Sequence, residues 1–171
     1  MSSNAQSSRP RPMAVSDPRI GRLFSRAFRA HAQAFNAKAA SLGISLQQFL
    51  ILNALWDQDG VDQTRLSKKL QVQRASLTGV LHALEQAGHV YRAVDPQDGR
   101  KLCVFLTPEG AALKQPLQAT AGEIGSTAIQ GIQASDVEKT IQVVEIIIKN
   151  LSEISKEPTA PASMNAIRKK K

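Results

Sequence analysis

Residues 62–106, DQTRLSKKLQVQRASLTGVLHALEQAGHVYRAVDPQDGRKLCVFL, contain the pattern that decides the fold. Asp62 suits the N-cap of a short helix that ends near Leu70, because its carboxylate can accept from the free backbone N–H groups of the first turn. After a turn around residues 71–73, a second helix is expected from about Arg74 to Ala87. Its apolar residues repeat at helical spacing and form the expected buried stripe: Leu77, Val80, Leu81 and Leu84.

Two β-prone segments follow the second of these helices. Gly88 is placed to end the helix, and residues 90–94 and 101–106 are rich in the residues that strands favour. The Asp, Pro and Gly of residues 95–100 suit the turn of a hairpin between them. Two helices with a short turn, followed by a hairpin, predict a mainly α winged helix-turn-helix protein.

The segments before this pattern predict two further helices. Ser16 or Asp17 can cap a first helix that begins with Pro18 and ends near Gly43. Ser45 and Gln48 have the spacing of a capping box, which opens a helix that runs to about Asp57. Ile44 and Phe49 are placed to form the hydrophobic staple at its start.

The segments after this pattern predict two more helices, which makes six in all. Thr107 and Pro108 open a fifth helix, and Ser135 and Glu138 have the capping-box spacing for a sixth. We therefore expect one domain over residues 16–155, with a DNA-binding lobe at about 45–106 and flanking helices at about 16–43 and 107–154. By composition, tails 1–15 and 156–171 are expected to be disordered, although their basic residues can still contact DNA.

The net charge of +8 is unevenly distributed along the 171 residues. The two tails hold most of it, and inside the domain residues 63–101 carry seven Lys and Arg against three acidic residues. Residues 102–155 carry three Lys against six acidic residues. The basic charge of the domain therefore coincides with the helix-turn-helix, as expected for a surface that meets nucleic acid.

Composition and spacing also exclude several classes of protein. Cys103 is the single cysteine, and the three histidines have no metal-ligand spacing to it or to each other, so we expect no metal and no disulfide. Without a nucleophile–base pair or a phosphate-binding glycine loop, the chain is not expected to be an enzyme. No apolar run reaches the length of a membrane span, and no secretory signal opens the chain, so a cytoplasmic location is expected.

The exposed side chains at the start of the 74–87 helix are candidates for reading base edges in the major groove. A helix-turn-helix inserts this half of its second helix, and Arg, Gln and hydroxyl groups are suited to guanine, adenine and phosphate contacts. The alternative is a solvated helix face with one arginine. The candidate residues are Gln73, Arg74, Ser76, Thr78 and His82.

Three stretches resemble the signature of the MarR family of bacterial regulators. They are LEQAGHVYR at residues 84–92, DPQDGR at 95–100 and LTPEG at 106–110, and the similarity extends over about residues 17–155. The resemblance implies a homodimer that packs through the first, fifth and sixth helices and binds a pseudo-palindromic operator in double-stranded DNA. It also implies that Arg100, oriented by Asp98 and beside Lys101, reaches the minor groove, where negative potential favours a guanidinium. The alternative for Asp98 and Arg100 is a local ion pair.

Two residues depart from the family pattern. Gly99 stands where many relatives carry a second arginine, and Gln73 occupies a position where a Ser or Asp cap is common.

Residues 26–53 are similar to those of members that respond to aromatic acids such as protocatechuate. In that comparison Arg26 occupies the position of an arginine that holds the ligand carboxylate, and Phe49 and Asn53 are further ligand candidates. His31 joins them because it lies within the apolar stripe of the first helix. The alternatives are a solvated or dimer-contacting Arg26 and a structural His31.

Sequence alone thus predicts a cytoplasmic, nucleoid-associated bacterial transcription regulator. We expect a repressor released by a small phenolic or aromatic carboxylate effector, with no other cofactor and no membrane partner. The alternative is an architectural DNA-binding protein that has no effector and whose basic tails dominate binding.

Overall fold

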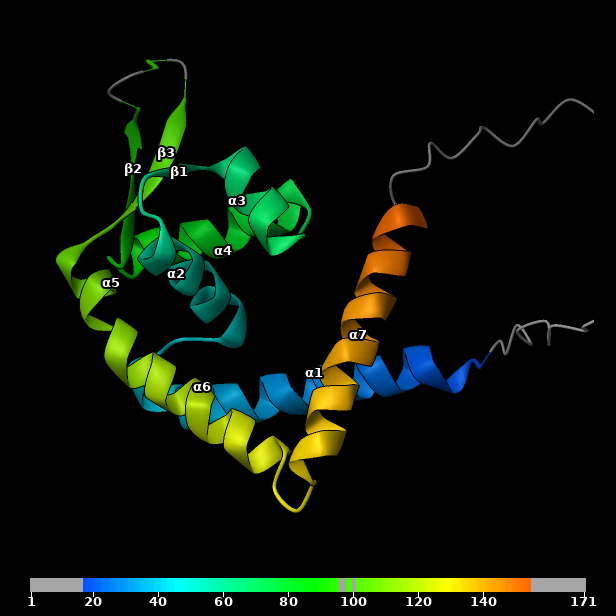
Figure 1. Ribbon diagram of the computed structural model, residues 1–171. Coiled ribbons are helices and arrows are strands. Elements are labelled where there is room, and N and C mark those ends of the chain that lie inside the picture. The colour runs from blue at the N-terminus through cyan, green and yellow to red at the C-terminus, as the bar shows by residue number, and fades with distance from the viewer. Residues whose placement is uncertain (1–16, 96–97, 100, 155–171) are drawn as a thin grey trace, which may run out of the picture. The chain divides into compact units, whose positions relative to one another are not determined.

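Figure 1 shows the computed structural model of the chain, in which residues 17–95, 98–99 and 101–154 are described. It contains a first compact unit that ends at Gly125 and a second that begins at Ser126. The elements, in chain order, are α1 (Arg19–Lys38), the 3-10 turn η1 (Ala40–Leu42), α2 (Leu46–Asp57), β1 (Val61–Asp62), α3 (Gln63–Leu70), α4 (Arg74–Gln86), β2 (Val90–Val94), β3 (Leu102–Leu106), α5 (Pro108–Ala112), α6 (Lys114–Ala128) and α7 (Ala134–Ile154).

The start of α2 confirms the predicted capping box. The Ser45 hydroxyl accepts from the Gln48 backbone N–H at 3.3 Å, and the Gln48 side chain accepts from the Ser45 N–H at 2.8 Å. Ile44 and Phe49 are both buried, as the predicted staple requires. Gly43 precedes them with φ of +66°, a left-handed conformation that favours glycine, so the chain turns here from η1 into α2.

A small antiparallel sheet has the strand order β1-β3-β2. The predicted hairpin is present, with Val90 opposite Leu106 and Val94 opposite Leu102. The third strand, β1, pairs Val61 with Val104 and was not predicted, because two residues are too short to show an alternating pattern. Helices and a small sheet together confirm the predicted mainly α, winged helix-turn-helix class.

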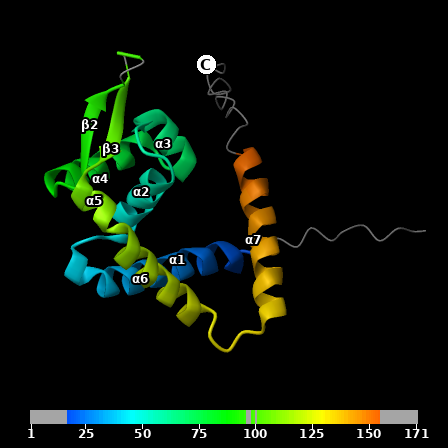
Figure 2. The same cartoon turned by 60° about the vertical axis from the view of Figure 1, so that its left-hand side comes forward.

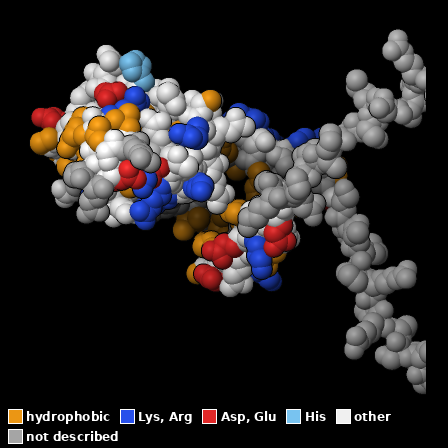
Figure 3. Space-filling view, turned by 90° about the horizontal axis from the view of Figure 1, so that it is seen from above, with side chains coloured by type: hydrophobic (Ala, Val, Ile, Leu, Met, Phe, Trp, Pro, Cys, Tyr) orange, Lys and Arg blue, Asp and Glu red, His pale blue; other side chains and the backbone are white. Residues whose placement is uncertain are grey.

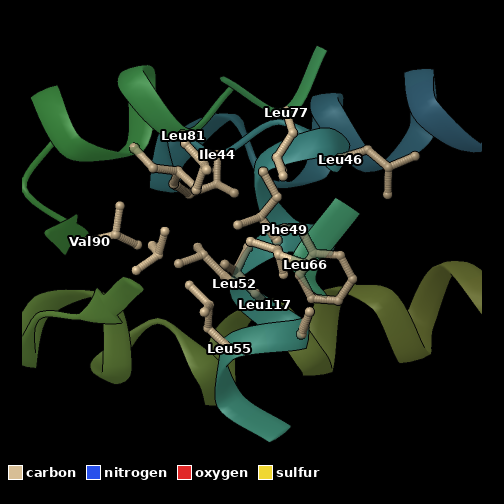
Figure 4. Close-up of a cluster of buried hydrophobic side chains, with 14 of the residues drawn as sticks. Ile44, Leu46, Phe49, Leu52, Leu55, Leu66, Leu77, Leu81, Val90 and Leu117 are labelled. Carbon is tan, nitrogen blue, oxygen red and sulfur yellow. The ribbon is translucent and has the colours of Figure 1, made fainter. Parts of the chain in front are cut away.

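The core of the first unit lies between α2, α4 and the sheet. Leu77 and Leu81 of α4 point into it and meet side chains of α2, α3 and α6 (Figure 4). Leu84 of α4 belongs to the same buried cluster. Phe35 of α1 joins this core and packs on Phe49, with ring centroids 4.8 Å apart. The labelled core residues include Leu52, Leu55, Leu66, Leu77, Leu81, Val90 and Leu117.

The predicted fifth helix is broken into α5 and α6. Thr107 caps α5 as expected, and its hydroxyl accepts from the Gly110 N–H at 3.0 Å. The break falls at Leu113, three residues before Pro116. Proline has no N–H for the carbonyl of residue 112, and its ring crowds that carbonyl, so a continuous helix is disfavoured there.

The capping box predicted at Ser135 is wrong. α7 begins at Ala134, and the carbonyl of Gln133 accepts from the N–H groups of Asp136 and Val137. Ser135 therefore lies inside the first turn, where it cannot be the N-cap.

α1 and α7 are long helices (Figure 2). Both expose apolar side chains in the described part of the chain. α7, which lies in the second unit, has no buried residue, although isoleucine, valine and leucine recur along it at helical spacing. α1 exposes Ile20, Leu23, Phe24 and Phe28 along its N-terminal half and buries only Phe35. Such stripes are normally covered in a folded protein, so each helix has a face available to another surface.

Gly110 is needed at the corner where β3 passes into α5. A Cβ on this residue would lie 2.0 Å from the carbonyl oxygen of His89, which already accepts from the Thr107 N–H at 3.1 Å. The Gly110 carbonyl in turn accepts from Trp56 Nε1 at 3.1 Å. The backbone of His89 therefore leaves no room for a side chain at Gly110.

We expect Gly110→Ala to lower the free energy of unfolding by about 2–3 kcal/mol, because backbone must move to admit the methyl group. Gly79→Ala is the control: nothing lies within 4 Å of its Cβ position in α4, and alanine favours the helix by about 1 kcal/mol. Urea unfolding at one protein concentration measures the free energy of unfolding of both variants. Equal stability of Gly110→Ala and the parent chain would contradict the crowding at this corner.

Candidate nucleic-acid interface

The turn between α3 and α4 fixes the angle between the two helices. Asp62 caps α3, with its carboxylate accepting from the N–H groups of Thr64 and Arg65 at 2.9 Å each. α3 ends at Leu70, the C-cap residue Gln71 has a left-handed φ of +54°, and α4 begins at Arg74. Both predicted boundaries are confirmed. Gln73 occupies the N-cap position but makes no side-chain cap bond, which leaves its amide exposed to solvent.

The buried leucines of α4 lie on one side of the helix, so the opposite side faces solvent. Successive residues of a helix are about 100° apart, so Arg74, Thr78 and His82 follow one another along one flank. All three are exposed. The Thr78 hydroxyl donates to the Arg74 carbonyl at 2.9 Å, and its oxygen can still accept. This flank presents a guanidinium, a hydroxyl and an imidazole side by side.

Ser76 lies apart from these three residues. Its position is two residues from both Arg74 and Thr78, which places it on the opposite flank of α4. There it lines a hollow with Gln47 and Leu50 of α2. The structure therefore divides the predicted recognition set between two flanks of the helix.

Ala75 and Gly79 lie between the two flanks, facing away from the core, and they were not among the residues predicted from the sequence to contact DNA. Both are exposed, and the Cβ position of Gly79 has open space around it. Small residues at the outermost positions let a helix backbone come close to a groove floor. Their spacing, four residues apart and opposite the leucines, is the signal that could have identified them.

Basic side chains of α3 adjoin this surface. Arg65 and Lys68 are exposed, and neither makes an ion pair with another described residue. Lys69 instead lies 3.3 Å from the Asp57 carboxylate and donates to the Ala54 carbonyl, which holds it at the end of α2. Figure 3 shows lysine and arginine side chains distributed over the face of the lobe that carries the wing. Arg65 and Lys68 are further candidates for phosphate contacts.

The described part of the wing turn is closed by hydrogen bonds. The Asp95 N–H donates to the Lys101 carbonyl at 2.8 Å, and the Lys101 N–H donates to the Asp98 carbonyl at 2.9 Å. Lys101 Nζ lies 3.1 Å from the Asp98 carboxylate, which raises the pKa of the lysine. Arg100 lies outside the described residues, so its predicted minor-groove contact and its orientation by Asp98 stay predictions.

Cys103 is buried on β3. Burial raises the pKa of the thiol, and the nearby Asp95 and Asp62 carboxylates raise it further. A raised pKa leaves less thiolate at neutral pH, and the thiolate is the form that reacts.

The four predicted ligand contacts lie in different surroundings. Arg26 lines an open hollow on α1 with Gly21, Arg22, Ser25 and Arg29. Phe49 is in the core between Phe35 and Trp56. Asn53 is half-buried on α2, and His31 is exposed on α1 rather than buried. No hollow found in the described part of the chain contains all four, and their ligand roles stay predictions.

Among the described residues, no three His, Cys, Asp or Glu side chains are grouped so that they could hold a metal ion. None of the described helices has the length and apolar character needed to cross a membrane.

The arrangement of a capped α3, an exposed α4 and a β2–β3 wing defines a winged helix-turn-helix protein. Comparison with known proteins identifies the family. The MarR family model matches residues 44–102. The transcriptional repressor NicR of Pseudomonas putida is 30% identical over 68% of this chain and 74% of its own length. The curated relatives are matched over about half to three quarters of their own length.

Solved structures agree with this assignment. A MarR transcriptional regulator from Methanosarcina mazei superposes with a TM-score of 0.73 and 27% identity, covering 81% of this chain and 99% of that one. BpsR of Bordetella bronchiseptica, whose DNA binding is regulated by 6-hydroxynicotinic acid, has a TM-score of 0.68 and 26% identity, covering 75% and 98%. The chain belongs to the MarR family of transcription regulators, which are DNA-binding proteins and not enzymes.

We expect Arg74→Ala to relax sequence preference, with a loss of about 1–3 kcal/mol on the preferred site if the guanidinium contacts a base edge. Lys68→Ala is the contrasting variant, because loss of a phosphate contact weakens all sequences alike and reduces the salt slope. Gel shifts with specific and scrambled DNA at several salt concentrations measure both. An unchanged preference in Arg74→Ala would remove this arginine from base readout.

We also expect Cys103 to resist alkylation at pH 7 in the folded protein and to react readily in denaturant, because burial and two carboxylates raise its pKa. Mass spectrometry after iodoacetamide treatment counts the modified chains, and the unfolded chain is the control. Rapid labelling of the folded protein would show an accessible, reactive thiol instead.

Proposed function

We propose that this protein is a homodimeric repressor that binds a pseudo-palindromic operator through α4 and the wing, and that a small aromatic acid releases it. The observation that carries the proposal is the exposed flank of α4 that presents Arg74, Thr78 and His82. The leucines on its buried side hold this flank outward, and groups of this kind read base edges.

Dimer formation is supported by the apolar stripes on α1 and α7. In the described single chain these helices expose residues such as Leu23, Phe28, Ile148 and Leu151, each about half exposed. A second copy that covers these stripes provides the burial they lack, and it places two copies of α4 on one palindrome.

An effector acid is supported by the composition of α1 and by a relative. Arg22, Arg26 and Arg29 line one hollow, spaced by about one helical turn, and no described residue forms an ion pair with them. Guanidinium groups are suited to carboxylates because they can donate two parallel hydrogen bonds. The 6-hydroxynicotinic acid named for BpsR is an aromatic carboxylate, which is the ligand class proposed for Arg26.

A gel shift with DNA from upstream of the protein's own gene tests the proposal. The DNA is compared with a scrambled copy at physiological salt, with and without benzoate-type acids. Specific binding that one acid releases is the expected result. Equal binding to both DNAs would favour an architectural protein without sequence preference, and it would overturn the proposed repressor.

We expect Arg26→Ala to abolish release by the acid and to leave operator affinity unchanged, because α1 lies outside the helix-turn-helix. Lys114→Ala on α6 is the matched control, since it removes an exposed cation elsewhere in the chain. Operator titrations with increasing acid concentration measure the response. If the acid still releases the Arg26→Ala variant fully from the operator, Arg26 does not hold the carboxylate of the acid.

A further inference from the structure

An ion pair joins the last turn of α4 to the wing. Arg92 Nη1 of β2 lies 3.6 Å from the Glu85 carboxylate of α4, and the two side chains are 21% and 32% exposed. Between them the chain turns at Gly88, whose φ of +74° is left-handed, and the His89 N–H donates to the Leu84 carbonyl at 2.9 Å. Neither charged residue was among the site residues predicted from the sequence.

The Arg92 guanidinium makes few other interactions. Its Nε and Nη2 atoms are buried and form no hydrogen bond with a described residue. A buried donor without an acceptor costs stability, and an apolar side chain of similar volume avoids that cost. The contact with Glu85 is too long for a hydrogen bond, so it acts through charge attraction. Stability alone therefore does not explain an arginine at this position.

Arg92 lies where β2 leaves the surface of α4. Side chains of a strand alternate between its two faces, so Val90, Arg92 and Val94 point to the same side. Val90 is buried at the base of the wing, whereas Val94 is exposed. In the described sheet β2 is an edge strand, with β3 as its neighbour. Beyond Arg92 the hairpin extends away from α4 (Figure 1), so the ion pair is placed to hold it at the point of departure.

A small change of angle at Arg92 is amplified at the end of the wing. The distance along the strand from Arg92 to Asp95 is roughly 10 Å. Over this length, a rotation of about 10° moves the end of the strand by roughly 2 Å. Groups that recognise a ligand must be held to within about 0.5 Å of their productive positions. A wing that meets DNA beside α4 therefore needs a fixed angle to that helix.

We propose that Glu85 and Arg92 are positioning residues for DNA recognition, because their ion pair sets the angle between α4 and the wing. The pair acts through the exposed flank of α4 and through the wing turn. It determines how far apart along the DNA these two surfaces lie, and thereby which sites the protein accepts. This inference rests on the proposed function, in which α4 and the wing meet one operator.

The distance between two spin labels tests the angle without DNA. The labels are attached at Ala83→Cys on α4 and Gly99→Cys in the wing turn, in the full chain with Cys103→Ala. Both labelled positions are exposed, and nothing lies within 4 Å of the Cβ position of Gly99. An excess of unlabelled chains ensures that the measured distance lies within one copy.

The parent chain and Arg92→Lys are expected to show one narrow distance distribution, because lysine keeps a cation opposite Glu85. Arg92→Met is expected to lose the narrow distribution, because it removes the charge and keeps most of the apolar stem. A distribution in Arg92→Met as narrow as that of the parent would overturn the proposal.

Binding to DNA tests the consequence for recognition. The upstream DNA and its scrambled copy are titrated with Arg92→Met, with Glu85→Gln and with the double variant. Each single variant is expected to lose about tenfold in affinity for the upstream DNA and nothing for the scrambled copy, because only base readout needs both surfaces in register. The double variant is expected to bind as either single variant does, since each change removes the same interaction.

Glu109→Gln is the matched control for these titrations. Glu109 is an exposed glutamate of the first unit and forms no ion pair with a described residue. This variant should bind both DNAs as the parent does. Additive losses in the Glu85→Gln and Arg92→Met double variant would instead show that the two residues act separately, against the proposal.

Urea unfolding separates positioning from folding. Arg92→Met is expected to be at least as stable as the parent, because it removes the buried N–H groups that lack acceptors. Weaker binding to both DNAs together with lower stability would indicate a structural role and contradict the proposal. A parent chain that binds both DNAs equally would overturn the proposed repressor, whereas the label distances would still decide whether the ion pair sets the angle.

Discussion

The burial of three leucines on one side of α4 determines what the rest of the lobe can do. Leu77, Leu81 and Leu84 are almost fully buried against α2 and the sheet. Each buried leucine contributes about 2 kcal/mol, so rotation of α4 about its axis would be costly. The helix is therefore held with one fixed side toward solvent, and a surface that reads DNA must be held in this way.

The corner where β3 passes into α5 also restricts the end of α4. The Thr107 hydroxyl donates to the Gly88 carbonyl at 2.7 Å, and the Thr107 N–H donates to the His89 carbonyl. Both acceptors come directly after α4, so the end of the recognition helix and the start of α5 share one hydrogen-bonded corner. Trp56 joins α2 to the same corner through Gly110. A displacement of α5 cannot leave α4 unaffected.

The hollow on α1 and the hollow beside Ser76 differ in the charge of the side chains that line them. The α1 hollow has three arginines and no acidic side chain, whereas the hollow beside Ser76 has no charged side chain in its lining. Charge is costly to bury without a partner, so the first lining favours anions and the second favours uncharged apolar groups.

The sequence by itself determined the helix-turn-helix, the wing and the family. These rest on local chemistry: Asp62 and Ser45 supply cap oxygens, and the leucines of α4 repeat at helical spacing. The break between α5 and α6 was also readable in principle, since Pro116 removes an N–H from the expected helix.

Only the tertiary structure decided which predicted site residues lie together. Helical spacing already places Ser76 on the flank of α4 opposite Arg74, but only packing of α4 near α2 makes that flank one wall of a hollow. Phe49, a candidate ligand contact from the sequence, packs in the core against the tilted ring of Phe35. The two-residue strand β1 exists only because β3 offers a partner. Local patterns in the sequence determine helices and caps. Which side chains lie next to one another depends on contacts between residues far apart in the chain.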